Sequence, residues 1–96
     1  MRESLDEDIS VVFYYNAEKR HIQPYQITWH GRDYRLGKVD FHHRTKQGTT
    51  LVHHFSMADV NQTTYFKIAL DTSNLHWALE EYMDAGDMAV HYGRGE

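Results

Sequence analysis

The stretch YFKIALDTSNLHWALEEYMD, residues 65–84, decides the fold because it pairs with itself as a hairpin. If the polar residues 71–74 form the loop, every facing pair on one side is apolar: Leu70 with Leu75, Ile68 with Trp77 and Phe66 with Leu79. Lys67, Glu80 and Tyr82 then fall on the opposite side. This alternation predicts an antiparallel sheet with one buried and one solvated face.

A helix over residues 75–83 is the alternative for the second half of this stretch. Its apolar residues also fit helical spacing, Ser73 or Asn74 would cap its start, and Gly86 would end it. A helix would leave Trp77 outside the apolar stripe, and it would lose the match with the residues before the loop. We therefore favour the strand.

Two further hairpins fit the chain between residues 24 and 57. A turn at His30-Gly31 makes Ile27 face Tyr34, and Tyr25 then faces Leu36. The apolar positions change phase at Gly37, which is typical of a β-bulge. A three-residue loop at 47–49 gives the preferred register of the next hairpin: Val39 with Met57, Phe41 with Phe55, His42 with His54 and His43 with His53. A two-residue loop is the alternative register.

The expected fold is all-β, a small antiparallel meander of five or six strands curled into an SH3-like or partly open barrel. The single β domain spans residues 9–84, after a disordered acidic leader at 1–8. Residues 85–96 form a C-terminal tail, which is read either as a short edge strand at 88–92 or as disordered. The expected core consists of Val11, Phe13, Tyr15, Tyr25, Ile27, Trp29, Tyr34, Leu36, Val39, Phe41, Phe55, Met57, Phe66, Ile68, Leu70, Leu75, Trp77 and Leu79.

Composition limits the function classes. The 96 residues carry a net charge of −4 without a stripe of lysines and arginines, which argues against binding to duplex nucleic acid. There is no cysteine, which suits a reducing cytoplasm, and no apolar run is long enough for a membrane span. The absence of a cysteine nucleophile and of a G-x-S-x-G elbow argues against an enzyme. We expect a soluble, cytoplasmic, non-catalytic protein.

The eight histidines are the unusual component, and four of them lie on the hairpin of residues 39–57. In the preferred register His42 faces His54 with Asp40 on the same side, and His43 faces His53. Imidazoles on adjacent strands can share zinc or another transition metal. No third ligand is fixed by spacing beside either pair, so we treat metal binding as an alternative function rather than the main one.

Three outward tyrosines, Tyr14, Tyr65 and Tyr82, are the expected partner-binding residues. Tyr65 and Tyr82 lie diagonally across the last hairpin, with small residues nearby. Tyrosine beside small residues on a sheet face is typical of a protein-binding surface. An exposed edge strand would be a second means of binding a protein.

The hairpin ITWHGRDYRL, residues 27–36, together with Trp77-Ala78-Leu79 and Asp84, resembles a family of short bacterial β domains of unknown function. Members of that family share a W-G-x-x-Y hairpin followed by an aspartate turn and a terminal W-x-L strand. The resemblance implies the fold and an accessory role beside DNA-repair polymerases. From the sequence we expect a protein-interaction or accessory module. A histidine-rich metal-binding protein and a single-strand nucleic-acid binder using Trp29, Tyr34 and Arg32 are the alternatives.

Overall fold

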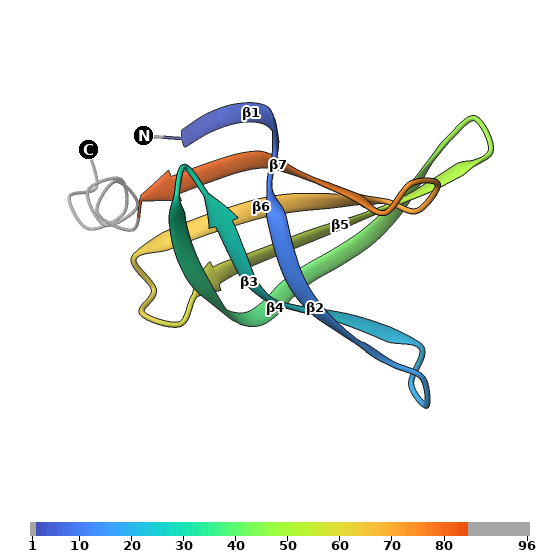
Figure 1. The fold of residues 1–96 in the computed structure, drawn as a ribbon, viewed down its shortest axis with the longest axis horizontal. Coiled ribbons are helices and arrows are strands. Elements are labelled where there is room, and N and C mark those ends of the chain that lie inside the picture. Colours follow the sequence, from blue (N-terminus) through green and yellow to red (C-terminus); the bar gives the residue numbers. More distant parts are fainter. Residues whose placement is uncertain (1, 85–96) are drawn as a thin grey trace, which may run out of the picture.

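The computed structural model describes the backbone of residues 2–84 and the side chains of residues 7–84, so the predicted edge strand at 88–92 lies outside the described residues. Seven strands form one antiparallel sheet in the order β1-β7-β6-β5-β4-β3-β2 (Figure 1). Their bounds are Arg2–Asp8 (β1), Ser10–Asn16 (β2), His21–Trp29 (β3), Arg32–Gln47 (β4), Thr50–Asp59 (β5), Thr64–Asp71 (β6) and His76–Asp84 (β7). The all-β prediction is confirmed, with one strand more than expected.

The extra strand is β1, so the prediction of a disordered leader is wrong. From β2 to β7 each strand pairs with the next, whereas β1 pairs with β7 at the far edge of the sheet. The chain passes from β1 to β2 through Ile9, whose N–H donates to the Trp77 carbonyl at 3.2 Å. The sheet therefore curls into a half-barrel whose two edges are joined by the start of the chain (Figure 1).

The polar sequence of the leader predicts disorder because it carries no apolar alternation. Backbone pairing with β7 stabilises it instead, and its last two side chains bind the barrel. Glu7 accepts hydrogen bonds from the Trp29 indole N–H at 3.1 Å and from His30 at 3.0 Å. Asp8 contacts His76 at 2.6 Å.

The core lies on the concave side of the sheet and contains most of the residues predicted for it. Its buried members are Ile27, Trp29, Leu36, Phe55, Met57, Phe66, Ile68, Leu70, Trp77 and Leu79. Val11, Tyr34 and Val39 are partly buried against them. None of the described residues forms a helix long and apolar enough to cross a membrane.

The last hairpin is a strand pair, as predicted, but its register is shifted by two residues. Leu70 pairs with Trp77 and Ile68 with Leu79, so the loop is residues 72–75. A shift of two keeps every side chain on its face, which is why Trp77 is still buried. Leu75 is wrongly predicted as core: it lies in the turn with φ of 59° and its surface is 66% exposed.

Two bulges explain why Tyr25 and Phe41, both predicted as core residues, are exposed. At His30-Gly31 the predicted turn is present, with Ile27 opposite Tyr34. However, Tyr25 is skipped in the β2–β3 register, so Pro24 takes the inward position and Tyr25 is exposed. Asp40 is skipped between β4 and β5, which turns Phe41 to the outer face.

The same bulge changes the register of the histidine hairpin. Val39 faces Met57 as predicted. After Asp40, however, each β4 residue pairs with the β5 residue one position later in the chain than predicted, and the strands are connected by the two-residue turn 48–49. His43 consequently faces His54, and His42 faces Phe55. The preferred three-residue loop is therefore wrong.

Phe13 and Tyr15 are predicted core residues that the structure leaves exposed. They face Pro24 and Ile22, so their side of β2 is the inward one. The β2–β3 hairpin nevertheless extends outward beyond the rest of the sheet (Figure 1), so the other strands do not cover its outer end. Only Phe13 reaches the core, with its ring centroid 5.4 Å from that of Trp77.

Candidate functional site on the outer sheet face

Two bulges build the candidate site on the outer, convex side of β4–β7. The skipped Asp40 turns Phe41 outward, opposite Ser56. A second skipped residue, Glu80, makes Glu81 face Lys67 and Met83 face Tyr65, all pointing outward. The two bulges thus bring the Phe41 ring and the Met83 thioether to the face on which Tyr65 already lies.

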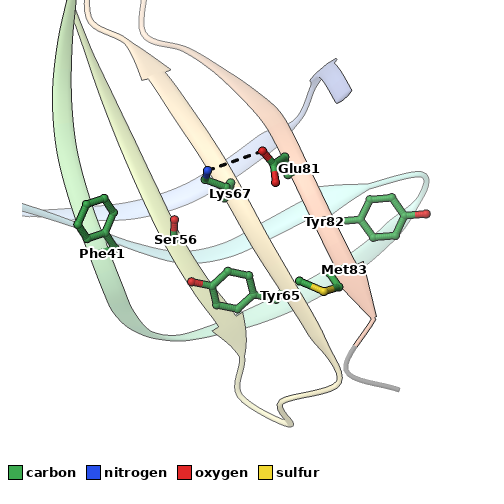
Figure 2. A pocket seen from close by; sticks show the side chains of 7 residues that line it. All are labelled: Phe41, Ser56, Tyr65, Lys67, Glu81, Tyr82 and Met83. Carbon is green, nitrogen blue, oxygen red and sulfur yellow. Dashed lines mark ion pairs between the residues drawn. The ribbon is translucent and has the colours of Figure 1, made fainter. Parts of the chain in front are cut away.

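These side chains surround a hollow of about 300 Å³ (Figure 2). Phe41 stands at one side, 58% exposed, and the Tyr65 ring lies between Ser56 and Met83. Along the upper wall Lys67 Nζ and Glu81 Oε2 are 3.7 Å apart. The hollow is therefore mixed in character: aromatic rings and a thioether share its lining with Ser56 and one partly exposed ion pair.

A second hollow of about 510 Å³ lies on the other side of Tyr65. Its lining is more polar: Gly37, Lys38, Asp40, Ala58, Asp59, Val60, Gln62 and Tyr65. Buried Asp59 fixes its loop, accepting hydrogen bonds from the Thr63 N–H at 2.6 Å and the Thr63 hydroxyl at 2.5 Å. A side chain at Gly37 would crowd this wall, because its Cβ would lie 3.3 Å from the Ala58 carbonyl oxygen. Tyr65 is the one residue common to the two linings.

The predicted tyrosine surface is not one surface. Tyr82 borders the first hollow, but its ring points away from the other lining side chains (Figure 2). The Glu80 bulge places Tyr82 opposite Phe66, and its ring packs against Trp29 at 4.7 Å. The prediction of Tyr82 as an outward residue beside Tyr65 is therefore wrong. Tyr14 is exposed, as predicted, but it lies on β2, far along the sheet order from β6.

The four histidines of the β4–β5 hairpin form two pairs on opposite faces, and neither is a predicted pair. On the inner face His42 Nε2 and His53 Nδ1 are 2.9 Å apart. On the outer face the rings of His43 and His54 stack at 4.6 Å. His54 also contacts Glu80 at 3.0 Å and Thr45 at 2.8 Å.

The inner pair resists protonation. Although His42 as a whole residue is exposed, its ring lies flat on the Phe55 ring, with the centroids 4.6 Å apart. The pKa of His42 is lowered, mainly by this burial and then by repulsion from His53 and His21. Burial is also the main reason that the pKa of His53 is lowered, with a further contribution from Arg44. An imidazolium in this cluster would face other cations.

The predicted metal ligands are not gathered into one site. Asp40 lines the second hollow, whereas His42 and His53 lie on the inner face and His43 and His54 on the outer face. Within residues 7–84 no group of three or more histidine, aspartate or glutamate side chains is arranged to hold a metal ion. A zinc or other transition-metal site among these residues has no support from the geometry.

The residues considered for single-strand nucleic acid already have other partners. Trp29 is buried and bound to Glu7. The Arg32 guanidinium lies over the Tyr34 ring, 5.2 Å from its centroid, and Tyr34 packs edge-on against Phe66. These side chains stabilise one end of the half-barrel and do not form an open stacking platform.

Sequence reasoning found Tyr65 but missed Phe41, Met83 and the second hollow. The glycine at the phase break signals a bulge near residue 37, but nothing in the pattern marks Asp40 or Glu80 as the skipped residue. In comparisons with protein-family models, curated proteins and solved structures, no match was found. The family resemblance stays a prediction.

Proposed function

We propose that this protein is a non-catalytic interaction module that binds an extended segment of a partner protein on the outer face of β4–β7. The observation that carries the proposal is the position of Tyr65, which lines both a hollow rich in aromatic rings and a second, more polar hollow. A segment lying across this ring presents side chains to both hollows at once.

The two linings indicate what such a segment contains. The first hollow suits an apolar side chain, because aromatic and methionine side chains offer adaptable apolar contact. The second hollow offers Lys38, Asp40 and Gln62 to a polar neighbour. An extended chain advances about 3.3 Å per residue, so residues two apart can enter neighbouring hollows while their backbone passes over Tyr65.

The test is selection of peptides from a random linear library displayed on phage, with the purified chain as bait. Selected peptides should share an apolar residue close to a polar or charged one. Their affinity should fall at least about tenfold for Tyr65→Ala, since central aromatic anchors typically supply a large part of binding energy. Tyr14→Ala is the matched control, because Tyr14 is an exposed tyrosine on another strand.

Two results would contradict this function. The first is failure of the library to yield any specific binder. The second is a set of peptides that bind Tyr65→Ala as tightly as the unaltered protein, which would place the contact elsewhere.

A further inference from the structure

Strand β2 has a free edge. It is the last strand in the sheet order and pairs only with β3 among the described strands. After the Ile9 hydrogen bond to Trp77, β2 runs out along the projecting β2–β3 hairpin and away from β7 (Figure 1). The backbone N–H and C=O groups along its outer side are thus directed at solvent or at another chain.

The edge lacks the charges and prolines with which proteins often prevent strand pairing. Its seven residues, SVVFYYN, contain no lysine, no other charge and no proline. Four consecutive side chains are exposed, by 57% for Val12, 38% for Phe13, 51% for Tyr14 and 53% for Tyr15. Long, apolar, uncharged edges are the ones that recruit a further strand.

We propose that β2 pairs antiparallel with β2 of a second copy of this chain, which makes a two-fold symmetric dimer with one continuous sheet. Two identical edges satisfy each other's backbone groups only in a symmetric arrangement. A pair centred on Phe13 aligns the full length of both strands. It sets Val12 of each copy opposite Tyr14 of the other, and aromatic side chains opposite β-branched ones stabilise antiparallel pairs.

The charge distribution permits a second copy as the occupant at this edge. The chain carries a net charge of −4, so two copies repel each other across most of their surfaces. The strip from Ser10 to Asn16 is uncharged and allows contact without opposing like charges.

The available area agrees with a weak dimer. A whole aromatic side chain contributes about 150–250 Å², so the half-exposed rings of Phe13, Tyr14 and Tyr15 and of Tyr25 on β3 each offer about 100 Å², as does Val12. Two copies can therefore cover roughly 1,000 Å², the lower limit for a specific interface. This proposal does not depend on the outer-face hollows.

Sedimentation equilibrium from about 10 µM to about 1 mM, a range that covers weak association, tests the dimer. The mass should rise from 11.4 kDa toward twice that value. Tyr14→Lys should remain monomeric, because the added charge would face the partner edge. Val60→Lys is the matched control: Val60 is an apolar residue with similar exposure outside the strands, and this variant should associate like the unaltered chain. Circular dichroism checks that both variants fold.

Cross-linking gives an independent result if Tyr14→Lys does not fold. The chain has no cysteine, so Phe13→Cys introduces a single thiol at the proposed two-fold axis. Mild oxidation should give a disulfide-linked dimer for Phe13→Cys and not for Val60→Cys.

Any of three outcomes overturns the proposal. One is an unaltered protein that stays monomeric up to the highest concentration. Another is a folded Tyr14→Lys variant that associates as strongly as the unaltered chain. The third is equal cross-linking of the Phe13→Cys and Val60→Cys variants.

Discussion

Trp77 connects the core to the closure of the half-barrel. Its ring is buried, with its centroid 5.7 Å from that of Phe55 and 5.4 Å from that of Phe13. Its carbonyl oxygen accepts the hydrogen bond of the Ile9 N–H, where the chain bends from β1 into β2. Side chain and backbone of one residue therefore serve two different parts of the fold.

Replacing Trp77 with alanine should lower the free energy of unfolding by about 3–5 kcal/mol, because a large buried ring is lost and a cavity remains. Urea unfolding followed by circular dichroism measures the change. Leu75→Ala, two residues away on an exposed turn, should change stability by less than about 0.5 kcal/mol. Equal effects of the two substitutions would contradict the register of β6 and β7.

Among the elements, the β4–β5 hairpin carries two histidines that should make stability depend on pH just below neutrality. The pKa values of His42 and His53 are both lowered in the folded protein, first by burial and then by neighbouring positive charges. Below about pH 6.5, the unperturbed histidine value, the unfolded chain therefore binds more protons than the folded one. Stability should fall as the pH drops below that value and level off below the folded pKa values.

The double variant His42→Gln/His53→Gln should weaken this acid dependence. Melting temperatures at a series of pH values between about 7 and 5, which spans the titration of histidine, give the comparison. Retention of the full pH dependence in the double variant would show that other groups cause it.

The strands could be predicted from the sequence, but the bulges that shape the candidate site could not. Ile27, Phe66 and Trp77 follow the alternation of their strands and are buried as predicted. A bulge adds one residue to one strand and exchanges the faces of everything after it. Apolar alternation does not say which residue is skipped, so Phe41 was predicted inward and Tyr82 outward. The site could be predicted only as far as Tyr65, because the bulge lies on β7 and the alternation along β6 is unbroken.

At the scale of the whole molecule, β1 links the two edges of the half-barrel. It pairs with β7, and its Glu7 binds Trp29 and His30. The polar leader is therefore a structural element, which its composition does not reveal.

Removal of residues 1–8 should lower the free energy of unfolding by about 2 kcal/mol or more, since several backbone hydrogen bonds, each contributing about 1 kcal/mol, are lost together. Amide hydrogen exchange should become faster along β7, whose outer edge is then open to water. Glu7→Ala is the control that removes only side-chain contacts, and it should have a smaller effect. A truncated chain as stable as the full one would contradict the pairing of β1 with β7.

The pairing of β1 with β7 also affects the order of folding. Each of the other strand pairs joins neighbours along the chain, whereas β1 and β7 come from its two ends. Closing such a long loop costs more entropy than closing a hairpin, so we expect the hairpins to form early and β1 to dock late. On the ribosome β1 is made first, yet its partner strand is complete only when Asp84 has been added. Until that point the nascent chain carries β1 without its partner. Of the described strands, β1 is therefore exposed longest to chaperones and proteases.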